Sequence, residues 1–155
     1  MTGGALEDLP DRLLLAVDHV GVAVADLDEA LAFYRTTFGL EVLHEETNEE
    51  QGVREAMLGP SGQPESATRL QLLAPLRDDS TIARFLERSG PGLQQLAYRV
   101  ADVEEAARVF RARGVRVLYD EPRRGTAGSR INFLHPKDCG GVLVELVEPS
   151  PDADH

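Results

Sequence analysis

One stretch of the chain occurs twice, and this internal repeat restricts the folds open to it. The run Val17–Ala30 recurs as Leu93–Ala106, so that His19 falls on Gln95. A second repeated segment lies at the end of each copy, where Leu70–Leu72 recurs as Val144–Leu146. Each copy of such a repeat is one supersecondary unit that buries its apolar face against the other copy. We therefore expect two similar modules related by a pseudo-twofold axis.

The repeat also predicts which polar side chains meet. Equivalent positions near the axis converge, which pairs His19 with Gln95 and Gln71 with Glu145. Each of the four lies in an otherwise apolar strand, where a polar side chain is costly to bury unless it is hydrogen-bonded or bound to a ligand. A metal or polar ligand site is the interpretation we favour. The alternatives are a hydrogen-bonded core histidine for His19 and, for Gln95, an amide that closes a site able to bind without metal.

The pattern of apolar residues, caps and turns predicts the same element order, βαβββ, in both copies. In the first copy Asp26 caps a helix that Gly39 ends, and Asp102 and Gly114 do the same in the second. The strands expected in the first copy are 17–24, 40–46, 52–58 and 68–73, and those in the second are 93–100, 115–119, 130–134 and 141–148.

These elements define the expected domain organisation. An N-terminal arm, 1–14, precedes a single domain, 15–148, and a polar tail, 149–155, follows it. Within the domain we expect module one at 17–75, a linking helix at 79–89 and module two at 92–148. The loop 120–129 is rich in Gly and Arg, and a loop of this length inside a compact domain is usually functional or disordered.

Composition excludes several classes of partner. The formal net charge is −11, which argues against nucleic acid because the phosphates would be repelled. The single cysteine, Cys139, cannot form an intrachain disulfide and is compatible with a reducing cytosol. The sequence has neither a long apolar run nor a signal peptide pattern, so we expect a cytoplasmic protein without a membrane partner.

Three longer stretches carry a family resemblance. They are Asn48–Glu55, then Leu118–Pro122 followed by Gly128–Phe133, and finally His135–Lys137 ahead of Gly141–Leu146. With these stretches and two βαβββ units, the chain resembles the vicinal oxygen chelate superfamily from about residue 17 to residue 147, and within it the methylmalonyl-CoA epimerases. The resemblance implies an α+β fold, in which two pseudo-twofold related modules form a curved mixed sheet around a metal site. It also implies a homodimer.

The resemblance assigns roles to particular residues. The family's metal ligands fall on His19, Gln71, Gln95 and Glu145, and its proposed base on Glu55. By the same resemblance, Glu145 is the candidate for the second catalytic carboxylate, on the opposite face of the α-carbon, although it also serves as a metal ligand. The third ligand departs from the family, which usually has a His-His pair where this chain has Gln94–Gln95, and we expect Gln94 to face away from Gln95. A set of one nitrogen and three oxygens suits cobalt, manganese or magnesium better than zinc, and it counts against an iron dioxygenase.

The activity that the resemblance implies is metal-dependent epimerisation of methylmalonyl-CoA or a close 2-substituted malonyl thioester. The α-proton would be removed to give a metal-stabilised enolate. Cations for the coenzyme A phosphates or the substrate carboxylate would come from a local basic cluster made up of Arg123, Arg124, Arg130 and Lys137. The alternative is that these side chains are ordinary solvated surface, as arginines on a polar loop often are.

Two other functions stay open. One is a non-catalytic small-molecule binding or resistance protein, and the other is a different vicinal oxygen chelate lyase or isomerase of secondary metabolism. Retention of Glu55 and Glu145 favours an enzyme, whereas loss of the fifth-strand His favours the alternatives.

Overall fold

A single mixed sheet of eight strands organises the molecule, and its strand order reflects the duplicated sequence. The computed structural model describes residue 9 and residues 12–151. The sheet order is β2-β3-β4-β1-β5-β8-β7-β6. The strands are β1 (Ala16–Ala23), β2 (Glu41–Asn48), β3 (Val53–Gly59), β4 (Arg69–Pro75), β5 (Gly92–Arg99), β6 (Arg123–Arg124), β7 (Arg130–Leu134) and β8 (Val144–Glu148).

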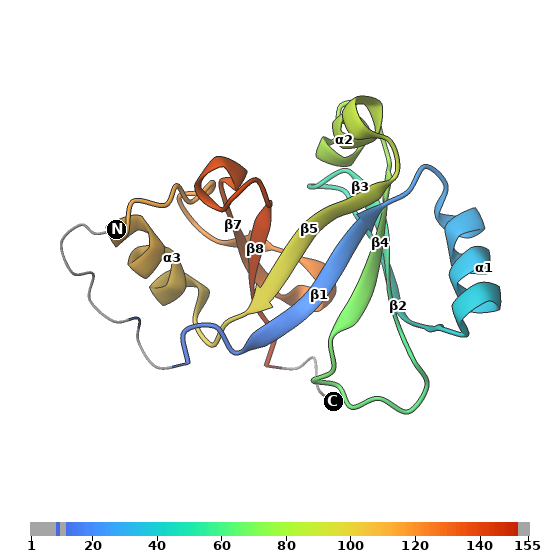
Figure 1. Ribbon diagram of the computed structural model, residues 1–155, viewed down its shortest axis with the longest axis horizontal. Coiled ribbons are helices and arrows are strands. Elements are labelled where there is room, and N and C mark those ends of the chain that lie inside the picture. Colours follow the sequence, from blue (N-terminus) through green and yellow to red (C-terminus); the bar gives the residue numbers. More distant parts are fainter. Residues whose placement is uncertain (1–8, 10–11, 152–155) are drawn as a thin grey trace.

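The two halves of the sheet are arranged alike. In the first module β1 pairs in parallel with β4, and in the second β5 pairs in parallel with β8. The modules join where β1 and β5 pair antiparallel at the centre of the sheet (Figure 1). This is the α+β fold of paired βαβββ modules that the repeat predicts, and that prediction is confirmed.

Each module carries its own helix against the outer face of the sheet. The helix α1 (Leu27–Phe38) begins at Asp26, whose carboxylate accepts a hydrogen bond from the Glu29 N–H at 3.0 Å. The helix α3 (Val103–Ala112) begins at Asp102 in the same way. A buried apolar cluster lies under each helix, so the outer face is where the modules bury most of their large apolar side chains.

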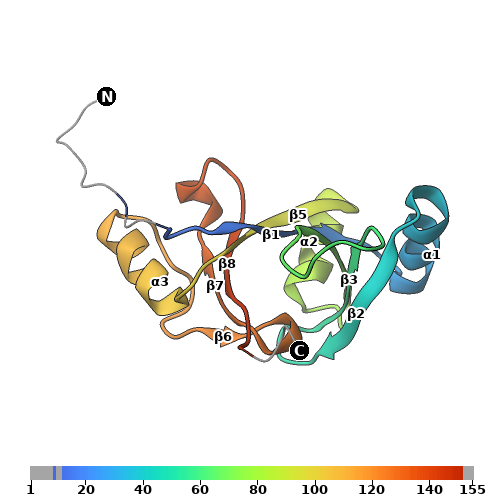
Figure 2. The ribbon, with the colours of Figure 1, turned by 90° about the horizontal axis from the view of Figure 1, so that it is seen from below.

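The sheet curls and encloses an inner face that carries both polar and apolar side chains. Figure 2 shows the β2 and β6 ends of the sheet brought round toward each other below β1 and β5. The short helix η1 (Thr126–Gly128) reaches across from the second module, where the Ala127 N–H donates to Glu46 of β2 at 2.7 Å. The linking helix α2 (Thr81–Ser89) is capped by Ser80, and it packs Ile82 into a cluster with Val53 and Leu73.

Two sequence-based expectations need correction. The predicted strand 115–119 forms only an isolated bridge, Val117 with Leu134, and the sixth strand is the two-residue β6. The physical reason is that the Asn132 side chain accepts from the Tyr119 N–H and donates to the Tyr119 carbonyl, both at 3.0 Å, in place of a regular ladder. The predicted strand 141–148 begins only at Val144, after a turn and the short helix η2 (Pro136–Asp138).

The predicted N-terminal arm, 1–14, lies mostly outside the described residues, and so does the end of the predicted tail. Leu13 is described and packs into the core of the second module. No helix in the described part of the chain is long and apolar enough to cross a membrane.

Candidate active site

The four polar residues paired by the repeat lie on the four central strands of the sheet. His19 is on β1, Gln71 on β4, Gln95 on β5 and Glu145 on β8. Three of them are buried, with exposed fractions of 2% for His19, 3% for Gln71 and 6% for Glu145. Burial of these groups is costly unless they find partners, and they find them in one another.

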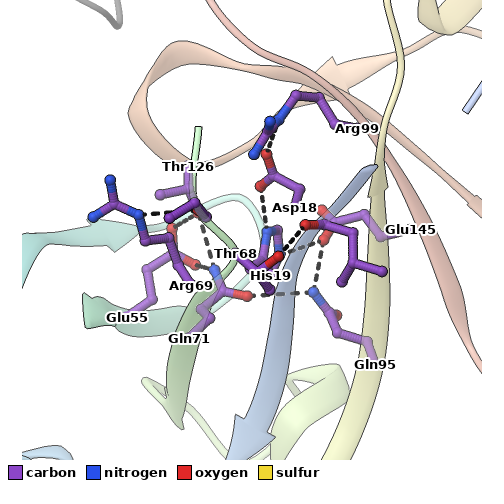
Figure 3. A network of polar contacts seen from close by, with 12 residues as sticks. Asp18, His19, Glu55, Thr68, Arg69, Gln71, Gln95, Arg99, Thr126 and Glu145 are labelled. Carbon is purple, nitrogen blue, oxygen red and sulfur yellow. Dashed lines mark hydrogen bonds and ion pairs between the residues drawn. The ribbon is translucent and has the colours of Figure 1, made fainter. Parts of the chain in front are cut away.

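The four side chains form one polar cluster on the inner face (Figure 3). The Glu145 Oε1 atom lies 2.9 Å from His19 Nε2 and accepts a hydrogen bond from Gln95 Nε2 at 2.7 Å. The same Gln95 nitrogen lies 3.3 Å from Gln71 Oε1. The structure therefore brings together all four residues that the repeat singles out. Their role as metal ligands stays a prediction.

Asp18 holds the outer nitrogen of the His19 ring. The His19 Nδ1–H donates to Asp18 at 2.7 Å, and Arg99 Nε donates to the other oxygen of Asp18 at 2.8 Å. Burial disfavours the charged imidazolium, but the hydrogen bonds to Asp18 and Glu145 outweigh it and raise the pKa of His19 to about 9. In the metal-free protein at neutral pH, the ring therefore carries a proton on both nitrogens.

Glu55 on β3 is a buried carboxyl beside the cluster, with 4% of its surface exposed. Thr126 Oγ1 donates to Glu55 Oε1 at 2.5 Å, and Gln71 Nε2 lies 3.3 Å from Glu55 Oε2. Burial raises the pKa of Glu55 to about 7, against the opposing effect of the Thr126 hydrogen bond. A carboxyl with such a pKa can accept and return a proton at neutral pH.

Asp18 is one site residue that the sequence analysis missed, and Thr126 is another. Thr126 lies in the loop 120–129, and the length of that loop was the one signal that pointed to it. Its hydroxyl also accepts a hydrogen bond from Gln71 Nε2 at 3.0 Å. Thr126 thus connects Glu55 of the first module to η1 of the second.

The cluster faces a cavity of about 190 Å³. Its polar lining includes Glu55, Gln71, Gln95 and Glu145. Much of the remaining wall is apolar: Val53, Leu73, Ile82, Leu118, Ile131, Phe133 and Leu143. His19 and Asp18 line a second, larger and more polar cavity of about 740 Å³, which shares Glu145 and Thr126 with the first. The polar cluster therefore lies between the two cavities.

The predicted basic cluster meets the first cavity at one point only. The Arg123 guanidinium stacks over the ring of Tyr119 at 3.8 Å, and Tyr119 lines that cavity. Arg130 instead forms ion pairs with Glu104 at 2.7 Å and Glu148 at 3.3 Å. Arg124 and Lys137 are exposed, and neither of them lines the first cavity. Substrate binding by these residues stays a prediction.

The expected direction of Gln94 is wrong. Gln94 lines the same cavity as Gln95 instead of facing away from it. The reason is a β-bulge between β1 and β5, where Gly21 pairs with Gln95 but its neighbour Val22 pairs with Leu93. The extra residue in β5 breaks the alternation of side chains that a regular strand would impose.

Comparison with known proteins identifies the family. A family model described as the glyoxalase/bleomycin resistance protein/dioxygenase superfamily matches residues 18–133. The chain belongs to this superfamily. Within the superfamily it is similar to methylmalonyl-CoA epimerase from Mycobacterium tuberculosis, whose crystal structure shares 53% identity at a TM-score of 0.86 and covers 93% of this chain and 94% of that one.

Two other members of the superfamily show the same likeness. A methylmalonyl-CoA epimerase solved in complex with methylmalonyl-CoA and NH₄⁺ is 54% identical at a TM-score of 0.84, covering 89% of this chain and 96% of that one. The ethylmalonyl-CoA/methylmalonyl-CoA epimerase of Cereibacter sphaeroides is 39% identical over 84% of this chain and 95% of its own length. These relatives confirm the predicted family and enzyme class, which is an isomerase of the epimerase type.

The polar cluster can be tested as a site for the divalent metal ion that proteins of this superfamily generally bind. Among the described residues, no three His, Cys, Asp or Glu side chains could hold a metal by themselves, so a site here needs the amide oxygens of Gln71 and Gln95. The contacts bring His19 Nε2, Gln71 Oε1 and Glu145 Oε1 together on the inner face. Gln95 turns its amide nitrogen toward this group, and a half-turn about its soft terminal torsion would present the amide oxygen instead. One imidazole nitrogen and three oxygens fit a hard divalent ion.

Proposed function

We propose that the chain is a metal-dependent epimerase of methylmalonyl-CoA or a close 2-substituted malonyl thioester. The observation that carries the proposal is Glu55, a buried carboxyl with a pKa of about 7 beside the four-residue cluster. The substrate class is supported by the named relatives, one of which was solved with methylmalonyl-CoA.

The residues that would hold the metal are His19, Gln71, Gln95 and Glu145. A bound divalent ion of the cobalt, manganese or magnesium type supplies Lewis-acid stabilisation of negative charge on the substrate oxygens. Asp18 supports this set from outside, because it fixes the His19 ring through Nδ1.

Glu55 would take the α-proton of the substrate. Its carboxyl is held by Thr126 and Gln71, so little reorientation is needed when the proton moves. Glu145 lines the same cavity from the other module, and we propose it as the second carboxylate, on the opposite side of the α-carbon. The apolar walls exclude water and strengthen the electrostatic interactions within the cavity.

The coenzyme A arm of the substrate would leave the cavity past Tyr119. Arg123, which stacks on Tyr119, is placed there to meet an anionic group of that arm. The homodimer and the cytoplasmic location expected from the sequence stay predictions.

The test is exchange of the α-proton of methylmalonyl-CoA, followed by proton NMR in heavy water. The protein is loaded in turn with cobalt, manganese, magnesium or no metal. We expect metal-dependent loss of the α-proton signal, and Glu55→Gln should slow it by at least about 10²-fold because general base catalysis is lost. Glu41→Gln is the matched control, since Glu41 is an exposed glutamate on β2, and it should keep the wild-type rate.

Two outcomes would overturn the proposal. Absence of exchange by a demonstrably metal-loaded protein would exclude methylmalonyl-CoA as the substrate and direct the search to other thioesters. Failure to bind any of the three metals would favour the non-catalytic binding protein instead.

A further inference from the structure

The side chain of Gln94 has an unused hydrogen-bond acceptor. Its Oε1 atom is shielded from solvent, and it is the one buried side-chain nitrogen or oxygen among the described residues that has no hydrogen-bond partner. Leaving a buried acceptor unpaired destabilises a folded protein. Such an atom therefore calls for a partner that the chain itself does not supply.

The surroundings of Gln94 indicate where that partner would be. The bulge in β5 turns Gln94 into the cavity that also contains Glu55, Gln95 and Glu145. The amide groups of Gln71 and Gln95 are engaged within the polar cluster. Rotation about the terminal torsion of glutamine, which is soft, would turn the Gln94 oxygen from the wall toward the cavity. A donor on a bound molecule could then reach it.

The chemistry of the proposed substrate limits which of its groups can donate a hydrogen bond to Gln94. An ionised malonyl thioester carries only acceptor oxygens on its acyl group, namely the carboxylate and the thioester carbonyl. The first N–H group of a coenzyme A thioester belongs to the amide of the pantetheine arm, two methylenes beyond the sulfur. The Gln94 side-chain oxygen, which is an acceptor, can therefore pair with that N–H group, whereas the acyl group offers it no donor.

We propose that Gln94 is a specificity residue whose Oε1 atom accepts a hydrogen bond from the first amide N–H of the pantetheine arm. This inference rests on the proposed function, because it assumes an acyl-CoA thioester in the cavity. It adds that the enzyme recognises the thiol portion of its substrate next to the sulfur. A site that hydrogen-bonds a substrate N–H discriminates against analogues that lack it, since the protein acceptor is then left unpaired.

The test compares two small thioesters of methylmalonic acid. One is the N-acetylcysteamine thioester, which keeps the amide N–H, and the other is its ketone analogue, in which a methylene replaces that N–H. Exchange of the α-proton is followed by NMR for the metal-loaded wild type, for Gln94→Met, and for Gln51→Met. Gln51 is the matched control because it lines the same cavity but donates to Tyr119 at 3.4 Å.

We expect wild type and Gln51→Met to prefer the amide thioester by about tenfold in kcat/KM, mainly through KM. In Gln94→Met this preference should fall to near unity, because the amide thioester loses its advantage and the ketone analogue is unaffected. Gln94→Met should also melt about 2–4 °C higher without substrate, since an unpaired buried acceptor is replaced by an apolar side chain of similar size.

The outcomes separate the two proposals. Absence of exchange with either thioester in the wild type would overturn the proposed function. Exchange of both thioesters with a wild-type preference that survives in Gln94→Met would overturn the role of Gln94 alone. A lower melting temperature for Gln94→Met would also contradict the inference, because it would show that the side chain has a structural partner.

Discussion

At the scale of single residues, the site depends on two buried groups whose protonation is displaced in the same direction. The pKa of His19 is raised from 6.5 to about 9, and that of Glu55 from 4.5 to about 7. In both cases the folded protein holds a proton more tightly than the unfolded chain does. The two groups therefore make the metal-free protein more stable in their protonated states.

This shift predicts how stability changes with pH. The contribution of Glu55 is fully present below pH 4.5 and is lost as the pH rises through 7, and that of His19 is present below 6.5 and is lost as the pH rises through 9. The free energy of unfolding of the metal-free protein should therefore fall between pH 5 and 9, with each group contributing on the order of 3 kcal/mol at most. Urea unfolding at intervals of one pH unit measures it.

Glu55→Gln isolates the carboxyl in this experiment. The variant should lose the slope between pH 5 and 7 and become more stable than wild type above pH 7, whereas Glu41→Gln should follow the wild-type curve. A wild-type curve that is flat from pH 5 to 7 would show that Glu55 has an ordinary pKa in the folded protein.

Asp18 gives a second prediction at this scale. Its carboxylate accepts from His19 Nδ1, with Arg99 on its other oxygen, so it orients the ring and increases the basicity of Nε2. Asp18→Asn should weaken manganese or cobalt binding, measured by calorimetry, by about 10- to 100-fold. The control Asp28→Asn alters only an exposed ion pair with Arg54 and should leave affinity unchanged. Equal affinities in the two variants would mean that Asp18 does not support the metal site.

At the scale of elements, the pairing of β1 with β5 is what forms the site. Gly21 lies two residues after His19, and a Cβ atom there would stand 2.6 Å from Cγ of Gln95 and 3.2 Å from Leu73. The glycine therefore leaves the space in which the Gln95 side chain lies. The bulge beside it brings Gln94 and Gln95 to the same face.

Gly21→Ala tests this close approach. The added methyl group should displace Gln95, destabilise the protein by about 1–3 kcal/mol and weaken metal binding, because overpacking moves a proposed ligand. Gly59→Ala is the control, since the atom nearest to its Cβ would be the Leu43 tip at 3.1 Å, farther than the 2.6 Å at Gly21. Thermal unfolding with and without metal measures both effects. Unchanged metal affinity in Gly21→Ala would show that Gln95 is not a ligand.

At the scale of the whole molecule, the cluster joins the two modules. His19 and Gln71 come from the first module, and Gln95 and Glu145 come from the second. The Thr126 to Glu55 and Ala127 to Glu46 hydrogen bonds also cross from one module to the other. A ligand that binds this cluster binds the folded arrangement of both modules and not the unfolded chain.

Metal binding should therefore stabilise the molecule as a unit. At a free metal concentration of 100 times Kd, the gain is about 2.7 kcal/mol, or roughly 5–10 °C in melting temperature for a chain of this size. One cooperative transition should shift upward with cobalt or manganese and return on chelation. Glu145→Gln, which removes the only carboxylate of the proposed ligand set, should reduce the shift sharply. A shift of equal size in that variant would place the metal elsewhere.

The amino-acid sequence alone was enough to predict the paired modules, the helix caps at Asp26 and Asp102, and the four residues that meet at the centre of the sheet. These features follow from local patterns and from repeat symmetry, because equivalent positions on equivalent strands must converge near a pseudo-twofold axis. The predicted strand at 115–119 does not form. The reason is a tertiary contact, because the Asn132 side chain forms hydrogen bonds with the Tyr119 backbone groups that a regular β-ladder would pair.

The contacts that depend on loops and on strand register could be seen only in the folded protein. Thr126 reaches Glu55 because the curled sheet brings the loop of one module against β3 of the other. Gln94 faces the cavity because a single extra residue in β5 reverses its side, and a strand pattern gives no sign of such a bulge. Arg130 is engaged by Glu104 and Glu148 of its own module. Each of these outcomes is set by packing between segments far apart in the chain, on which the local sequence carries no information.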